Sequence, residues 1–349
     1  MKRKYAAILI IVVVVGTGSF LWNHFINPDP VSAELKQMVT DSKTSTFSVK
    51  KWEEADRYSK KAIKFKEKDE LMSSGNEFAV TGVKLKAPYG IACFPEGILL
   101  ADHGESCLYL IDYSGNLVRK IGELGNGPNQ FQKPTGCTYH NGYYYVIDSG
   151  NKRIVILDRQ FNYTKELKLP KSEREPEKEF TDIAINDKGD IYISGSYLYD
   201  SGLYRYNLGK EKFENVQKYF YGSLKEFDGE VYAVDQFRIY VDFEKKEITG
   251  GAGPNALWRL DGRNIKKLSN LPAGLNAGSF ELLRDNLIIC SPFHSAVMVF
   301  NMKNGKYMSN IYEVDKMDYK TYASIYGSDL YITEPEKGKI LKISLEKLQ

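Results

Sequence analysis

Short apolar runs recur along the chain from Glu77 onward at a nearly constant spacing. Each run ends in a polar residue, and the intervals between these last residues are 46, 46, 41, 56 and 42 residues. A second apolar run follows each first one, in one case only after an insertion. The first runs are residues 98–102, 144–148, 191–194, 231–235, 287–291 and 330–333.

A repeat of about 40 to 50 residues built from short strands is typical of a β-propeller blade, a sheet of four antiparallel strands. One blade cannot bury both of its faces, whereas six blades around an axis bury each face on a neighbour. We therefore predict an all-β domain over residues 76–349, a six-bladed β-propeller. Little sequence follows Ile343, so the last blade lacks its outer strand, and we expect residues 78–85 to supply it.

The N-terminus has a different pattern. Lys2, Arg3 and Lys4 precede residues 5–22, which are uncharged and largely aliphatic. Positive charge before such a run directs export and keeps the N-terminus in the cytoplasm. We predict a signal anchor over residues 1–23, a transmembrane helix in the inner membrane, with the propeller in the periplasm or at the cell surface. The small residues 16–19 leave a second interpretation open, a cleaved signal peptide and a secreted protein.

Residues 24–75 are charged and contain almost no glycine, which sets them apart from the repeats. Apolar residues recur there at spacings of three and four, the period of an amphipathic helix: Trp52, Ala55, Tyr58, Ala62 and Phe65. We predict a short helical stalk or linker that packs against the domain it carries. A helix that binds a partner is the alternative.

Charge and cysteine content exclude some functions. The net charge is +3, and the first thirty residues account for +2 of it, so no basic field is left to favour nucleic acid. The four cysteines have no metal-binding spacing. Cys93 and Cys107 are close enough in sequence to pair in an oxidising compartment. The alternative is that all four are buried strand residues.

Two segments resemble a known family. Residues 121–131 read Ile-Gly-Glu-Leu-Gly-Asn-Gly-Pro-Asn-Gln-Phe, and residues 148–154 read Asp-Ser-Gly-Asn-Lys-Arg-Ile. They resemble the inter-blade loop and the D-x-x-N-x-R-[IV] segment of NHL-repeat proteins, and most closely the exported bacterial 6-bladed β-propeller family. The resemblance implies the architecture and little about chemistry, because this fold carries binding proteins, scaffolds and enzymes.

In propellers the loops between second and third strands, with those joining blades, form the usual binding face. Tyrosine, arginine and mixed charges on a rigid ring suit recognition of a protein, peptide or glycan ligand. Asn151 and Arg153 have a second interpretation, a brace within their blade. The candidate ligand-binding residues are His103, Glu105, Asn151, Arg153, Tyr197, Tyr199, Arg238, Phe293 and His294.

The fourth repeat contains the insertion. Residues 237–254 read as a hairpin, and long loops on a repeat scaffold are commonly functional. Phe237, Tyr240 and Phe243 would give this hairpin an apolar surface for docking a partner. A hairpin that folds back over its own blade is the alternative.

Enzymatic interpretations have less support in the sequence. Six-bladed lactonases hold calcium with Glu, Asn and Asp in the channel, and lyases of the NHL group hold zinc with several histidines. Here the candidates would be Asp102, Asp148 and Asp235, yet an aspartate at a strand end commonly caps a turn. We therefore predict a binding module without a catalytic residue, metal or cofactor. The alternative is a hydrolase or lyase with a calcium or zinc ion in the channel.

Overall fold

The structure is a computed structural model, and its described residues form two units. One, the insert unit, contains the described residues 48–49, 238–242, 247–251 and 275; the other, the propeller unit, contains the described residues of 65–236, 256–272 and 276–349. The structure describes Ser48–Val49, Ser73 and residues 75–349, except for 172–178, 197–201, 219, 221, 236–237, 243–246, 252–255, 273–274, 276, 293, 315 and 319.

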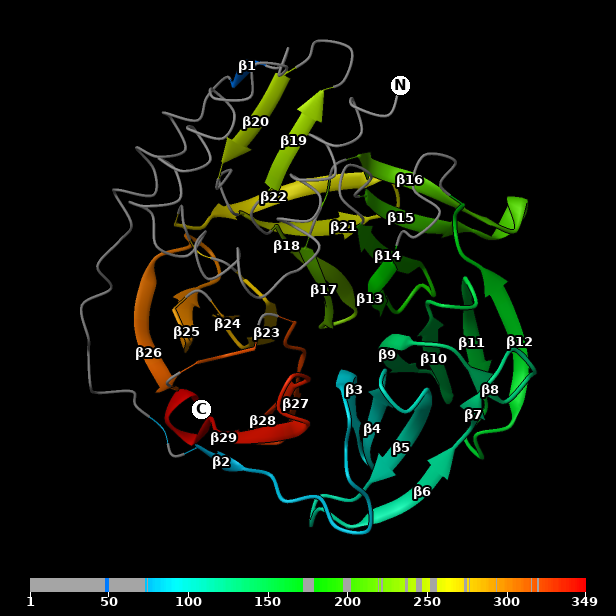
Figure 1. Cartoon of the computed structure of the whole chain (residues 1–349). Helices are drawn as coiled ribbons and strands as arrows, with labels where there is room; N and C mark the ends of the chain where they lie inside the picture. Colours follow the sequence, from blue (N-terminus) through cyan, green and yellow to red (C-terminus); the bar gives the residue numbers. More distant parts are fainter. Residues whose placement is uncertain are drawn as a thin grey trace, which may run out of the picture. The chain divides into compact units, whose positions relative to one another are not determined.

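The propeller unit consists of six four-stranded antiparallel sheets arranged around one axis (Figure 1). Blade 1 contains β3 (Pro88–Phe94), β4 (Gly97–Asp102), β5 (Cys107–Ile111) and β6 (Leu117–Ile121). Blade 2 contains β9 (Pro134–His140), β10 (Tyr143–Asp148), β11 (Arg153–Leu157) and β12 (Tyr163–Lys168). Blade 3 contains β13 (Glu179–Ile185), β14 (Ile191–Ser196), β15 (Gly202–Asn207) and β16 (Lys212–Lys218).

The other three blades complete the ring. Blade 4 contains β17 (Gly222–Phe227), β18 (Glu230–Asp235), β21 (Ala256–Asp261) and β22 (Asn264–Asn270). Blade 5 contains β23 (Ser279–Leu283), β24 (Asn286–Ser291), β25 (Ala296–Asn301) and β26 (Tyr307–Glu313). Blade 6 contains β27 (Ala323–Tyr326), β28 (Asp329–Glu334), β29 (Lys339–Ser344) and β2 (Gly75–Glu77). The predicted all-β, six-bladed architecture is confirmed, and each repeated apolar run is the second strand of its blade.

Burial explains the apolar runs. Every residue of β4 and β5 is buried, because both faces of blade 1 lie against neighbouring blades. One apolar cluster joins β4 and β5 to β10 and β11 of blade 2, and another joins blade 1 to β28 and β29 of blade 6. The outer strands are more exposed: β6 has three exposed residues and β12 has four. Strands buried on both faces have no reason to alternate.

Hydrogen bonds also link the innermost strands of neighbouring blades. Ser223 Oγ on β17 donates to the Gly278 carbonyl (3.0 Å), and the Ala323 N–H on β27 donates to Ser279 Oγ on β23 (3.0 Å). The ring closes where the Cys93 N–H on β3 donates to Ser324 Oγ on β27 (3.0 Å). These bonds fix the register of one blade against the next.

The strand that closes the ring differs from the expected one. Gly75–Glu77 pairs with β29, with Gly75 opposite Ile343 and Glu77 opposite Leu341. The expected strand at residues 78–85 is therefore wrong by position, although an N-terminal strand does close the last blade. Phe78 donates one more backbone hydrogen bond, to Ile340 (2.8 Å), and the chain then leaves the sheet. Its apolar residues, including the buried Phe78 and Leu85, pack against the core between blades 6 and 1 instead.

The insertion forms the predicted hairpin. β19 (Arg238–Asp242) and β20 (Glu247–Gly251) are antiparallel, and Tyr240 lies opposite Thr249. β1 (Ser48–Val49) adds a parallel strand to β20, so the described strands of the insert unit form a three-stranded sheet. Phe237 and Phe243, two of the predicted docking residues, lie outside the described residues.

The predicted anchor at 1–23 and the helical pattern at 52–65 also lie outside the described residues. Two short 3-10 helices, Leu208–Lys210 and Glu346–Leu348, are the helices of the described part. Neither is long and apolar enough to span a bilayer. All four cysteines are free thiols on strands, and Cys107, Cys137 and Cys290 are buried.

Candidate functional site

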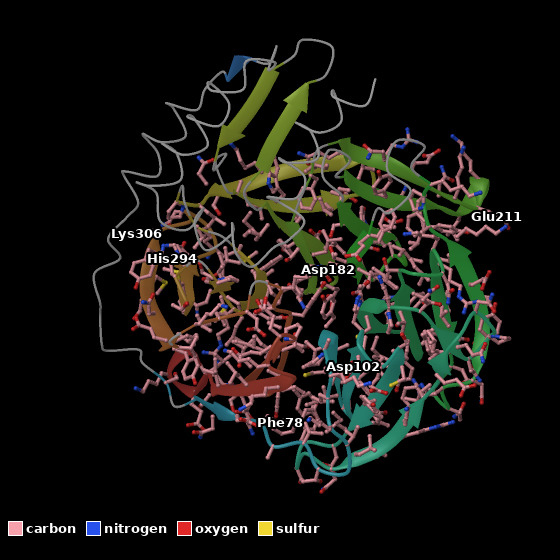
Figure 2. The ribbon with its side chains drawn as sticks, in the orientation of Figure 1. Phe78, Asp102, Asp182, Glu211, His294 and Lys306 are labelled. Atoms are coloured by element: carbon pink, nitrogen blue, oxygen red, sulfur yellow. The ribbon has the colours of Figure 1, made fainter. Side chains whose placement is uncertain are left out.

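The loop between β4 and β5, which carries His103 and Glu105, is held by a buried carboxylate. Asp102 ends β4 (labelled in Figure 2), and its Oδ1 accepts the N–H groups of Ala87, Gly104 and Glu105, each at 3.0 Å. Its Oδ2 accepts the N–H of Lys86 at 2.8 Å. The interpretation of a strand-end aspartate as a turn cap therefore fits Asp102. This cap fixes the direction in which the next residue, His103, projects.

His103 lies in a group of aromatic and charged residues that we call the rim cluster: Tyr89, His103, Glu179, Lys320 and Tyr322. The His103 ring stacks on Tyr89 with the centroids 4.3 Å apart and an interplanar angle of 14°. Tyr322 stacks on the same tyrosine at 6.0 Å, and Lys320 Nζ lies 5.4 Å from the Tyr89 centroid. Lys320 Nζ also pairs with Glu179 Oε2 at 3.4 Å.

The rim cluster joins blades from opposite sides of the ring. Glu179 begins β13 of blade 3, whereas Lys320 and Tyr322 precede β27 of blade 6. The innermost strands contact one another in the order β3, β9, β13, β17, β23 and β27, so blades 3 and 6 are not neighbours. The pair of Lys320 and Glu179 therefore crosses the end of the propeller axis. This end is the one formed by the loops that we predicted to carry the binding face.

Burial lowers the pKa of His103, and Lys320 and Lys133 add to this effect while Glu179 and a hydrogen bond to the Pro134 carbonyl oppose it. The imidazole is therefore neutral at pH 7. Its Nδ1 is buried and has no hydrogen-bond partner among the described residues. His103 thus contributes to the rim cluster as a neutral aromatic ring stacked on Tyr89.

Asn151 and Arg153 make the contacts of a brace. Arg153 is buried, and its Nε and Nη1 pair with Asp148 (2.9 Å) and Glu166 (2.8 Å). Its Nη2 donates to the carbonyl groups of Gly127 (2.7 Å) and Gln130 (2.8 Å).

The amide of Asn151 donates to Asp148 Oδ2 (2.7 Å) and to the Gly125 carbonyl (2.8 Å). Together with Arg153, it fastens the loop at 122–131 to blade 2, which is the second of the two interpretations offered above. Glu105 pairs with Lys86, and this partly exposed ion pair lowers the pKa of Glu105.

The other predicted binding residues are not part of the rim cluster or lie outside the described residues. His294 lies between β24 and β25, where its Nδ1 is 2.9 Å from Ser291 Oγ, and burial lowers its pKa to about 4. Arg238 lies on β19, which belongs to the insert unit. Tyr197, Tyr199 and Phe293 lie outside the described residues. Of the six predicted residues that the structure describes, His103 is therefore the one that belongs to the rim cluster.

Three charged residues on innermost strands form a second group that the sequence analysis did not find, the axial cluster: Asp182, Lys225 and Glu281. Figure 2 shows Asp182, on β13, near the axis of the ring. Lys225 Nζ, on β17, lies 2.9 Å from Glu281 Oε1 on β23 and donates to the Ala323 carbonyl on β27 at 2.5 Å. The sequence feature that could have indicated this cluster is a charged residue within the short apolar run that precedes the second strand of each of these blades.

The carboxylates of the axial cluster are strongly desolvated. Burial raises the pKa of Asp182 and of Glu281, and Lys225 opposes both shifts. Burial would lower the pKa of Lys225, but Glu281 and Asp182 outweigh it, so the ammonium stays charged. Asp182 Oδ2 accepts the N–H of Leu224 (2.9 Å) and its Oδ1 that of Ile183 (3.0 Å).

Part of the chain matches a known family. Residues 82–230 match the family model described as 6-bladed beta-propeller. Residues 82–230 are therefore similar to the 6-bladed β-propeller family. The resemblance that the sequence analysis stated is thereby confirmed, and no curated protein matches the chain.

Solved structures share the fold of this chain at low identity. A calcium-binding regucalcin from Agrobacterium tumefaciens has 14% identity and a TM-score of 0.54 over 78% of this chain and 94% of its own. A virginiamycin B lyase from Staphylococcus aureus has 13% and 0.52 over 78% and 99%, and a gluconolactonase from Xanthomonas campestris has 11% and 0.55 over 78% and 89%. At these identities the likeness shows the fold alone.

Proposed function

We propose that this propeller is an extracytoplasmic binding module, tethered to the inner membrane by its N-terminus, that recognises a protein, peptide or glycan with its rim cluster. The observation that carries the proposal is the stack of His103 on Tyr89 beside the pair of Lys320 and Glu179. The charge pattern of residues 1–23 supports the tether and the location outside the cytoplasm.

The chemistry of the rim cluster suits recognition. Tyr89, His103 and Tyr322 are half-buried and stacked, so little side-chain entropy remains to be lost when a ligand binds. Lys320 and Glu179 are partly exposed, at 45% and 33%, and supply one donor and one acceptor of opposite charge. A surface that combines rigid aromatic rings with paired charges is typical of a binding site for a polar polymer.

The alternative, a metal-dependent hydrolase or lyase, has support from the fold alone. The regucalcin is named as calcium-binding and two neighbours are named as a lyase and a gluconolactonase. In this chain, however, Asp102 and Asp148 already bind backbone N–H groups. Among the described residues, no three His, Cys, Asp or Glu side chains converge to hold a metal ion. The described acidic residues therefore do not fit a divalent cation.

A comparison of two variants of the full-length protein tests the proposal. Immobilised wild-type protein is screened against a glycan array and a displayed peptide library, and the dissociation constants of the hits are measured. His103→Ala with Lys320→Ala should weaken the binding of these hits by at least tenfold, since residues at the centre of a site contribute about 2 kcal/mol or more.

Lys303→Ala is the matched control. It removes an exposed lysine that pairs with Asp285 at 2.9 Å in turns at the opposite end of blade 5. It should leave every dissociation constant unchanged. Hits that bind the rim variant and the wild-type protein equally would show that recognition uses another surface, and a screen without any hit would argue against these ligand classes.

A further inference from the structure

The propeller axis contains an ion pair that most soluble proteins would place at the surface. The exposed fractions of the Lys225 and Glu281 side chains are 17% and 11%, and Asp182 is 8% exposed. A carboxylate removed from water costs free energy unless a positive charge or several donors compensate it. Asp182 and Glu281 are two such carboxylates, and they come from the two blades on either side of the blade that carries Lys225.

Lys225 contacts residues from most of the ring. Its blade, blade 4, lies between blade 3, which carries Asp182, and blade 5, which carries Glu281. Its ammonium also reaches the Ala323 carbonyl on blade 6, which is not a neighbour of blade 4. One cation thus bonds directly to blades 5 and 6 and attracts the carboxylate of blade 3.

We propose that the Lys225 ammonium is the resident cation of the propeller axis. Its positive charge compensates the buried carboxylates of Asp182 and Glu281, as a bound divalent metal ion would. The protein therefore holds blades 3 to 6 together without such an ion. This proposal does not depend on the rim cluster or on its ligand.

The donor set supports the assignment. Calcium takes six to eight oxygen ligands, and zinc takes about four ligands that must be deprotonated. Both oxygens of Asp182 accept backbone N–H groups, and one oxygen of Glu281 lies against Lys225. A divalent ion would also have to approach the ammonium, which repels it. An ammonium fits this position because it needs acceptors alone, and Ala323 supplies a neutral one.

Thermal melting of the purified full-length protein tests this assignment. The wild-type melting temperature should be the same after dialysis against EDTA and after addition of calcium, manganese or zinc. Lys225→Gln should melt several degrees lower, because Glu281 is left buried without a cation. Lys225→Gln with Glu281→Gln should recover part of that loss, because Glu281 no longer carries a charge, whereas Asp182 keeps its two backbone N–H donors but not its cation. Lys303→Gln, which breaks an exposed ion pair, should melt as the wild-type protein does.

Several results would overturn the proposal. One is a wild-type protein that melts several degrees lower in EDTA or that contains a stoichiometric divalent metal. Another is a Lys225→Gln variant that melts with the wild-type protein. If the single variant fails to fold, the comparison is made on soluble yield: a double variant that folds supports the assignment, and one that also fails refutes it.

Discussion

Asp102 and Asp148 end the second strands of blades 1 and 2, and both bind the backbone of the loop that enters the blade. Asp148 Oδ1 accepts the N–H of Gln132 at 2.6 Å, as Asp102 accepts those of Lys86 and Ala87. In blade 2 the buried Arg153 also bonds to the carboxylate of Asp148 and to the Gly127 carbonyl in the loop at 122–131. The residues that carry the family resemblance are therefore residues that hold a loop in place.

This role predicts the effect of removing Arg153. Arg153→Ala should lower the free energy of unfolding by about 3 kcal/mol, because Asp148 would stay buried without its charge partner. Urea denaturation of the purified protein measures the loss. Arg159→Ala, at an exposed arginine on the same blade, should change it by less than about 0.5 kcal/mol. Equal stability of the two variants would contradict the bracing role.

At the scale of single residues, the sequence predicted in which loops the polar residues lie, but it did not predict which residues they contact. The repeat placed His103 and Arg153 in loops at one end of the propeller, but their contacts with Tyr89 and Glu166 depend on how separate segments pack. The role of Lys225 was not predicted, because a single charged residue in an apolar run forms no repeating pattern. Only the closed ring shows that it meets Glu281, 56 residues further along the chain.

At the scale of elements, the first and last segments of the propeller share one sheet. The sequence predicted this closure because five repeats had a full set of strands and the sixth did not. It misplaced the strand because residues 78–85 are more apolar than Gly75–Glu77. Burial and strand pairing are separate: Phe78 is buried by packing, whereas β2 is fixed by its backbone bonds to β29.

Pairing through the backbone makes β2 sensitive to proline. Asn76 lies opposite Lys342, and a proline there cannot donate a hydrogen bond to the neighbouring strand. Asn76→Pro should lower the free energy of unfolding by about 2 kcal/mol, because the pairing of β2 with β29 loses a backbone hydrogen bond and the proline ring restricts the strand. Denaturation in urea gives the value. Asn76→Thr, which keeps the N–H and favours strands, should match the wild-type protein; a proline variant of full stability would mean that β2 does not close the ring.

At the scale of the whole molecule, the insertion interrupts a blade without interrupting its sheet. β18 and β21 are neighbours in blade 4, with Val234 opposite Leu257, although residues 236–255 separate them in the chain. The hairpin of this insertion pairs with β1 in a sheet of its own. We therefore expect the propeller to keep its strand order and its axial cluster without the insertion, as a repeat scaffold that accepts loops between strands should.

Replacement of residues 236–255 by Asn-Gly tests this independence. The register of β18 and β21 brings Asp235 and Ala256 opposite each other, and Asn-Gly forms the two-residue turn that joins such strands. The shortened protein should keep its β-type circular dichroism, and its melting temperature should change by less than about 4 °C, the shift that 1 kcal/mol gives in a domain of this size.

A replacement by Pro-Pro, which cannot form that turn, is the control and should destabilise blade 4. An aggregated or unfolded Asn-Gly protein would show that the propeller depends on the insertion, and the sheet that β1, β19 and β20 form would then belong to its folding core.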